Sequence, residues 1–176
     1  RNTGYGACVG VDLNRNYDAN HAGPGASDRP CSDTYHGPSA FSEPESAAQR
    51  SYMQSYIDDG SLKAFLTFHS YSQLIIFPYS YDYTSQAPNK AELTSVGEEM
   101  SAAIRSVHRL TYAAGQGTDL LYAAAGGSDD WAYDAMLAAG NDGPLSYTFE
   151  LRDEGRYGFL LPANQIQPNC EEIDAA

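Results

Sequence analysis

The chain has 176 residues and a formal net charge of −13, and it begins at Arg1 without a Met or a signal peptide. This length supports one domain with a real core. The acidic balance argues against nucleic-acid binding, and no apolar run approaches the ~20 residues of a membrane-spanning helix. We therefore expect a globular protein that attracts cationic groups and has no nucleic-acid or membrane partner. Because the sequence starts at Arg1, we also expect a processed or incomplete product.

Residues 1–40 carry turn-forming Gly, Pro, Asn and Asp at high density, interrupted only by a predicted short strand over 8–12. The three cysteines permit one disulfide and leave one thiol over. Cys8 and Cys31 bracket this loop-rich segment, where a cross-link stabilises a chain that has little regular structure. If they pair, we expect Cys170 to be a buried free thiol and the compartment to be oxidising.

A helix start follows, with Ser42 expected to cap it, Pro44 in its first turn and Glu45 completing a capping box. The helix is predicted to run toward Gly60. Four side chains at helical spacing form its expected apolar stripe: Tyr52, Met53, Tyr56 and Ile57.

Two apolar runs, 64–68 and 74–77, flank His69 and a short polar patch. They predict two strands that are buried on both faces of a sheet. A His at the end of such a strand stands where open α/β sheets bind ligands. It could be a structural histidine with satisfied hydrogen bonds, or a metal ligand, because imidazole is a common donor to zinc.

Residues of about 90–110 are predicted to form an amphipathic helix, followed by a loop over 115–127. Ser128 is expected to cap a shorter helix that ends at Gly140, and another helix is predicted to begin at Cys170. Helices that alternate with buried strands indicate an α/β fold. The apolar positions of the long helix are Leu93, Val96, Met100, Ile104, Val107 and Leu110.

Residues 146–151 are predicted to form a strand whose alternation places Thr148 and Glu150 on the same face. An ionised carboxylate in such an apolar strand is costly unless it is paired or functional. Glu150 could therefore form a structural pair with Arg152 or another base. It could equally be a general base whose pKa is raised by desolvation.

Two polar clusters could bind a ligand. Arg15 carries a guanidinium group between the amide side chains of Asn14 and Asn16, an arrangement that suits a carboxylate. An ordinary solvated Arg is the simpler interpretation. Asp129 and Asp130 lie at a helix start, where the exposed amides favour carboxylates. In their glycine-rich context they could also place negative charge at the bottom of a pocket.

Histidine spacing does not predict a complete metal site. His21 and His36 lie in Gly/Pro-rich loops, His108 lies on the amphipathic helix, and none of the three belongs to a His-x-x-Glu motif. His69 is therefore the one convincing zinc ligand, whereas a catalytic zinc needs three protein ligands and an open position.

Five motifs together resemble the zinc metallocarboxypeptidases of the pancreatic type, and in particular the carboxypeptidase B type, which removes C-terminal Lys or Arg. The resemblance covers nearly the whole chain, in the same order. It implies a mixed, largely parallel central sheet flanked by helices, with residues 1–176 forming the C-terminal part of a single catalytic domain. The motifs are Gly10–Asn16, Thr34–Gly37, His69–Leu74, Gly126–Trp131 and Phe149–Phe159.

The resemblance implies one zinc ion, with His69 as the third zinc ligand and Glu150 as the general base toward water. It also implies a disulfide between Cys8 and Cys31. The resemblance further implies three groups of substrate-binding residues. Those that bind the terminal carboxylate are Asn14, Arg15 and Tyr122, and those of the pocket floor are Asp129 and its small neighbours Ser80 and Gly117. Those that line the cleft are Ser70 and Tyr71.

In the resembled family, three functional residues lie upstream of the position of Arg1: the other two zinc ligands and the Arg that polarises the scissile carbonyl. Arg1 itself corresponds to a basic residue that follows this Arg. An N-terminal fragment of the same enzyme is therefore expected as a partner that supplies His-x-x-Glu and this Arg. The family's long C-terminal helix is cut off after Glu172. The resemblance also implies a secreted, extracellular enzyme made as a zymogen.

We thus expect a zinc-dependent exopeptidase that acts on peptides and proteins with C-terminal Lys or Arg. One alternative is a non-catalytic protein of the same fold that binds peptide ends, which would keep the cleft without zinc. Another is an A-type carboxypeptidase with an apolar preference, against which Asp129 argues.

Overall fold

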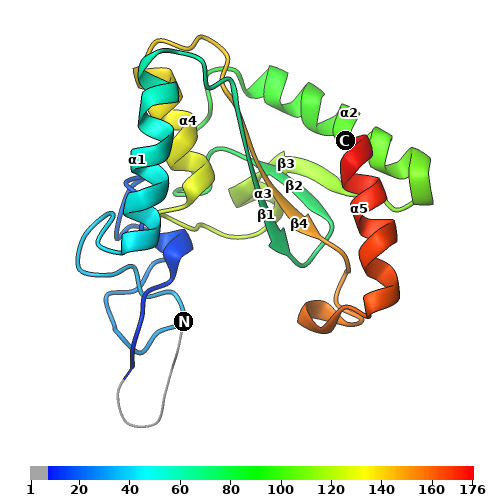
Figure 1. Cartoon of the computed structure of the whole chain (residues 1–176), viewed down its shortest axis with the longest axis horizontal. Helices are drawn as coiled ribbons and strands as arrows, with labels where there is room; N and C mark the ends of the chain where they lie inside the picture. The colour runs from blue at the N-terminus through cyan, green and yellow to red at the C-terminus, as the bar shows by residue number, and fades with distance from the viewer. Residues whose placement is uncertain (1–7) are drawn as a thin grey trace.

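A four-stranded sheet lies at the centre of the molecule (Figure 1). The computed structural model describes residues 8–176, so the interpretation of Arg1 lies outside the described residues. The strand order is β1 (Ala64–Ser70), β4 (Leu145–Leu151), β2 (Leu74–Phe77) and β3 (Ala113–Gln116). β1 runs parallel to β4 and β2 parallel to β3, whereas β2 and β4 are antiparallel. The predicted mixed, largely parallel sheet is confirmed.

Helices cover both faces of this sheet (Figure 1). α1 (Pro44–Asp58) and α4 (Ser128–Ala138) lie on one face, and α2 (Lys90–His108) and α5 (Ile166–Ala175) lie on the other. No helix in the described part of the chain has the length and apolarity needed to cross a membrane. The short helices are η1 (Leu13–Arg15), α3 (Gly117–Leu120), η2 (Gly158–Leu160) and η3 (Ala163–Gln165).

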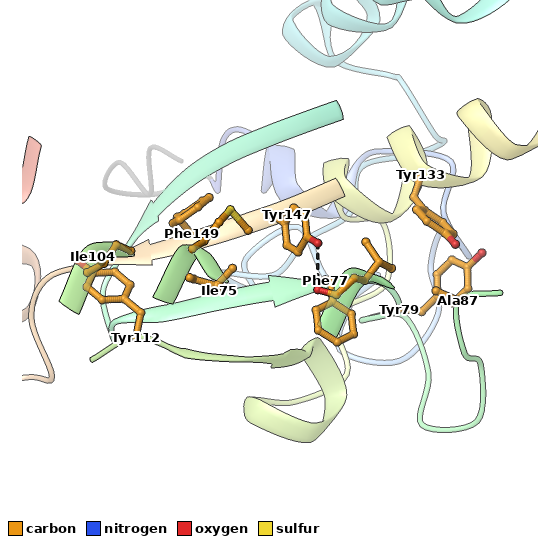
Figure 2. Close-up of a cluster of buried hydrophobic side chains, with 11 residues drawn as sticks. Ile75, Phe77, Tyr79, Ala87, Ile104, Tyr112, Tyr133, Tyr147 and Phe149 are labelled. Atoms are coloured by element: carbon orange, nitrogen blue, oxygen red, sulfur yellow. Dashed lines mark hydrogen bonds between the residues drawn. The ribbon is translucent and has the colours of Figure 1, made fainter. Parts of the chain in front are cut away.

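The larger apolar core fills the space between the sheet and α2 (Figure 2). Ile75 and Phe77 of β2 pack beside Tyr147 and Phe149 of β4, and the Tyr147 hydroxyl donates a hydrogen bond to the carbonyl oxygen of Leu93 over 2.9 Å. Each such large side chain contributes roughly 1.5–3 kcal/mol by burial. The predicted alternation along β4 is confirmed: Tyr147 and Phe149 face this core, and Thr148 and Glu150 lie on the opposite face.

A smaller core joins α1 and α4 to the other face of the sheet. Met53 and Ile57 of α1 pack with Trp131 of α4 and Phe65 of β1. The predicted stripe of α1 is too wide, because two of its four residues, Tyr52 and Tyr56, are 71% and 44% exposed.

β1 lies at the edge of the described sheet, and its two faces differ. Phe65 is buried, but Leu66 and Phe68 are 48% and 51% exposed. The prediction that this strand is buried on both faces is therefore wrong for the described part of the chain, although its position in the sequence is confirmed.

Helix positions agree with the sequence better than helix starts do. The predicted amphipathic helix is α2. However, α1 begins after Glu43 rather than Ser42, whose hydroxyl donates to the Glu43 carboxylate instead of capping the helix. Ser128 is the first residue of α4 and not its cap, and α5 begins at Ile166 rather than at Cys170.

Three further expectations concern loops and cysteines. Residues 8–12 form no continuous strand, and the predicted loop over 115–127 contains the end of β3 and all of α3. Cys8 and Cys31 form the expected disulfide. Cys170 is a free thiol but is exposed rather than buried, because it lies on the outer side of α5.

Candidate active site

A cavity of about 260 Å³ lies against the sheet face that carries Thr148 and Glu150. Its walls come from the sheet, the loop that contains η1, the segment around α3 and the start of α4. The lining residues are Asp12, Asn14, Arg15, His69, Ser70, Ile76, Ser80, Gly117, Leu121, Tyr122, Ala124, Gly127, Asp129, Thr148 and Glu150.

His69 and Glu150 are brought together by strand register. The two residues are direct partners in the parallel pairing of β1 with β4, near the carboxyl ends of both strands. Neighbouring residues in adjacent strands project toward the same face of a sheet. Both residues line the cavity, so an imidazole and a carboxyl group share one small space.

The Glu150 carboxyl group is poised as a proton acceptor. Its Oε2 is buried and accepts no hydrogen bond from any described residue. Burial, with a further effect from the negative charge of Asp129, raises the pKa of Glu150 to about 7. The alternative that Glu150 pairs with Arg152 is wrong, because the Arg152 guanidinium donates to Glu172 of α5, with Nε 2.8 Å from Oε2.

Arg15 is held in the cavity wall by backbone oxygens. It is only 7% exposed, and its guanidinium donates to the carbonyl oxygens of Gly25 and Asn14 over 3.3 and 2.7 Å. The interpretation as a solvated Arg is therefore wrong. The Asn14 Oδ1 accepts the Ser128 N–H over 3.0 Å, so the Asn14 side chain offers its NH₂ group to a ligand. Two donors beside each other suit an anion.

Asp129 supplies negative charge from the first turn of α4. It is 4% exposed and lines the cavity, and burial raises its pKa while a hydrogen bond from Thr148 opposes the rise. Ser146 of β4 holds the backbone beneath it by donating to the Asp129 carbonyl oxygen over 2.8 Å. Asp130 is fully buried and does not line the cavity.

Ser80 and Gly117 form a close contact in the cavity wall. A Cβ placed on Gly117 would lie 2.0 Å from the Ser80 Oγ, so only glycine fits there. Tyr122 lies at the rim and is 57% exposed. Tyr71 is the one predicted substrate-binding residue that does not line this cavity: its ring packs against Phe159, with ring centroids 5.1 Å apart.

Several lining residues have no role in the sequence-based prediction: Asp12, Ile76, Leu121, Ala124, Gly127 and Thr148. Thr148 shares a strand face with Glu150, which is a usable signal in the sequence. Ile76 resembles an ordinary core residue of a buried strand, and Ala124 and Gly127 contribute mainly backbone. Their proximity to the site depends on tertiary structure alone.

The described residues fit part of a zinc site. Among them, no group of three or more His, Cys, Asp or Glu side chains could hold a metal ion. His69 nevertheless lines the same cavity as a buried carboxylate oxygen that has no hydrogen-bond partner among the described residues, and this pair suits one metal ligand and one proton acceptor. The residues that the structure describes therefore offer donors that suit part of a metal centre, but not a complete set of ligands.

Comparisons with known proteins identify the family of this chain. The model of the zinc carboxypeptidase family matches residues 1–176. The chain is 49% identical to carboxypeptidase B of Bos taurus over 166 residues, which cover 94% of this chain and 38% of that protein. It is 48% identical to carboxypeptidase A2 of Mus musculus over 165 residues, which cover 94% of this chain and 37% of that protein.

A solved structure has the same fold. Bovine thrombin-activatable fibrinolysis inhibitor, in complex with tick carboxypeptidase inhibitor, matches with a TM-score of 0.86 and 46% identity over 94% of this chain and 54% of that one. The chain thus belongs to the zinc carboxypeptidase family, and carboxypeptidase B is among its relatives. It spans less than two fifths of the length of these curated relatives.

Proposed function

We propose that this chain is the C-terminal part of the catalytic domain of a zinc-dependent carboxypeptidase that removes C-terminal Lys or Arg. The observation that carries the proposal is the shared cavity, which the strand partners His69 and Glu150 line together with Arg15 and the buried Asp129. A base, an anion grip and an acidic floor in one space suit the cationic end residue of a peptide.

A segment upstream of Arg1 completes the zinc site in this proposal. Two features support the need for more polypeptide: the edge strand β1 exposes Leu66 and Phe68, and His69 also borders a second cavity, of about 600 Å³. Exposed apolar residues on an edge strand are a liability unless another segment covers them. This segment supplies the other two ligands and the Arg of the family motif, and one ion is bound.

The residues of this chain would act as follows. His69 donates one ring nitrogen to the zinc ion, which supplies Lewis acidity when it is bound. Glu150 takes a proton from water as the water oxygen forms a bond with the last peptide carbonyl carbon. Glu150 then gives this proton to the leaving amine nitrogen as the C–N bond breaks.

Selectivity in this proposal has two sources. Arg15 and Asn14 pair with the free α-carboxylate, so a peptide with a blocked end loses the hydrogen bonds that their remaining N–H groups would donate to it. Tyr122 closes over the bound end, and Ser70 and Tyr71 line the approach to it. Asp129, a buried acid that lines the pocket, favours a cationic side chain and penalises an apolar one.

We also propose that the enzyme is secreted and made as a zymogen. The disulfide between Cys8 and Cys31 supports an oxidising compartment. The extracellular setting and the zymogen are what the resemblance to the carboxypeptidase B type implies.

The test is Asp129→Ala in the intact protein, with kcat/KM measured on peptides that differ only in a C-terminal Arg or Leu. We expect the variant to lose roughly 100-fold or more on the Arg peptide, because a buried charge pair is broken, and to lose little on the Leu peptide. Asp142→Ala, an acid in the turn after α4, is the matched control and should change neither value.

Other outcomes discriminate the alternatives. Equal losses on both peptides would contradict the assignment of Asp129 to the pocket floor. A wild-type preference for Leu over Arg would support an A-type enzyme, to which the 48% identity with carboxypeptidase A2 gives some weight. Binding of peptide ends without hydrolysis and without zinc would support the non-catalytic protein.

A further inference from the structure

Asp130 is a buried acid that the proposed chemistry does not use. It follows Asp129 in the first turn of α4, is fully buried and stays outside the cavity. Burying a carboxyl group without partners is costly. Besides the Tyr81 backbone, its partner here is a backbone N–H group of the cavity wall.

That N–H group belongs to Ser80, whose backbone N–H and C=O groups both form hydrogen bonds with residues in or just before α4. The Ser80 N–H donates to both carboxylate oxygens of Asp130, with N···O distances of 3.1 and 2.9 Å. The Ser80 carbonyl oxygen accepts the Ala124 N–H over 2.7 Å. Ser80 follows a short irregular stretch after β2, so these contacts fix a residue that no strand pairing holds.

The position of Ser80 matters because its side chain forms the pocket wall with Gly117. A Cβ on Gly117 would lie 2.0 Å from the Ser80 Oγ, which indicates that no slack exists between the two. A shift of Ser80 of even a fraction of an ångström therefore changes the width of the pocket. The wall depends on Asp130 just as the floor depends on Asp129.

We propose that Asp130 is a positioning residue that sets the shape of the side-chain pocket by holding Ser80. This inference rests on the proposed function, because it treats the cavity as the pocket for the C-terminal side chain. Asp129 then selects the C-terminal side chain of the substrate by its charge, and Asp130 selects it by its size. Neighbouring acids on one helix turn thereby have separable effects on substrate choice.

The experiment is Asp130→Asn in the intact enzyme, assayed on peptides that end in Arg, Leu or Ala. The Asn side chain has one acceptor oxygen, and its NH₂ group repels the Ser80 N–H. We expect kcat/KM to fall roughly tenfold on both Arg and Leu, which fill the pocket, and to stay unchanged on Ala, which does not reach the wall.

Asp134→Asn is the matched control. Asp134 is another acid on α4, but it accepts a hydrogen bond from the Tyr79 hydroxyl, over 2.6 Å, rather than from the cavity wall. The Asn oxygen can replace that acceptor, so we expect all three peptides to be cleaved as by the wild type. A general disturbance of α4 would instead lower all three rates in both variants.

Amide hydrogen exchange of wild-type enzyme provides a second measurement that does not depend on the variant folding. We expect the Ser80 N–H to be strongly protected, and in Asp130→Asn to exchange at least tenfold faster while the amides of β4 stay protected. Rapid exchange of Ser80 in the wild type would overturn the proposal. So would equal losses on the three peptides in Asp130→Asn.

These results separate the inference from the function beneath it. A wild-type protein that cleaves none of the peptides contradicts the proposed function. A wild-type protein that cleaves Arg peptides, with an Asp130→Asn variant that shows no dependence on side-chain size, contradicts only the role of Asp130.

Discussion

Glu150 acquires its chemistry from its surroundings rather than from its residue type. The strand that carries it is buried, its Oε2 has no hydrogen-bond donor among the described residues, and Asp129 is near enough to raise its pKa further. A carboxyl group in this state readily accepts a proton when it is ionised. The same side chain on the surface would be an ordinary solvated acid.

Replacing Glu150, the proposed base, should affect turnover more than binding. In the intact enzyme, we expect Glu150→Gln to lower kcat by about 10²- to 10⁴-fold, with a small change in KM, because the amide keeps the shape but cannot take the proton. Steady-state kinetics on a peptide with C-terminal Arg measure both constants. Glu154→Gln, an exposed neighbour, is the control. Wild-type turnover in Glu150→Gln would show that another group is the base.

At this scale, the sequence predicts residues whose chemistry conflicts with their surroundings. Glu150 in an apolar strand conflicts in this way. Asp129 does not, because a helix start favours a carboxylate, and its role was predicted from the family resemblance of its motif. Ile76 shows no such conflict, because it is an ordinary strand residue, and only the packing of the chain brings it to the cavity. Thr148 shows none either, and its one signal is the strand face that it shares with Glu150. Asp130 could not be separated from Asp129 without knowing which backbone group each one faces.

Among the elements, those with a strong apolar pattern were predictable. β2 and α2 follow directly from their apolar residues. β3 was not predictable, because Ala-Ala-Gly-Gln has little intrinsic preference for a strand and forms one by pairing with β2. The start of α1 differs from the prediction because the Ser42 hydroxyl binds the Glu43 carboxylate rather than a helix amide.

α4 carries buried acids whose charge should make stability depend on pH. Burial raises the pKa of Asp134 above its usual value, although the Tyr79 hydroxyl opposes the rise. Its contribution to stability is therefore present below the unfolded-state pKa and is lost as pH rises through the folded-state pKa. An uncharged substitute should remove this loss.

We therefore expect Asp134→Asn to gain stability relative to the wild type as pH rises from about 4 to about 7. Urea unfolding at several pH values measures the difference in unfolding free energy between the two proteins. Asp119→Asn, a largely exposed acid of α3, is the control and should show no comparable trend. A constant difference between Asp134→Asn and the wild type across this range would contradict the account of the acids on α4.

For the whole molecule, the disulfide ties down a segment that has little regular structure of its own. Cys8 and Cys31 are 23 residues apart, and the loop between them carries Arg15 and Asn14. We expect the double variant Cys8→Ser/Cys31→Ser to lose about 3 kcal/mol of unfolding free energy, mainly through the greater freedom of the unfolded chain. Chemical denaturation of the intact protein measures the loss. Cys170→Ser, which alters an exposed free thiol, should be neutral, and equal stability of all three proteins would refute the prediction.

The cavity with His69 and Glu150 lies beside an edge of the described sheet that no further described strand covers. The edge strand β1 ends in His69, and the apolar side chains of that strand are half exposed. This arrangement explains why the sequence predicts a family and a base but only one zinc ligand. In the proposed function, the remaining ligands come from the upstream segment.

The most direct test is the zinc content of the intact protein, compared with that of its His69→Ala variant, by elemental analysis after dialysis. The account predicts about one zinc ion per molecule in the wild type and a loss of most of it in the variant, because one of three protein ligands is removed. A variant that keeps its full zinc content, or a wild-type protein that cleaves peptides without any zinc, would contradict the account.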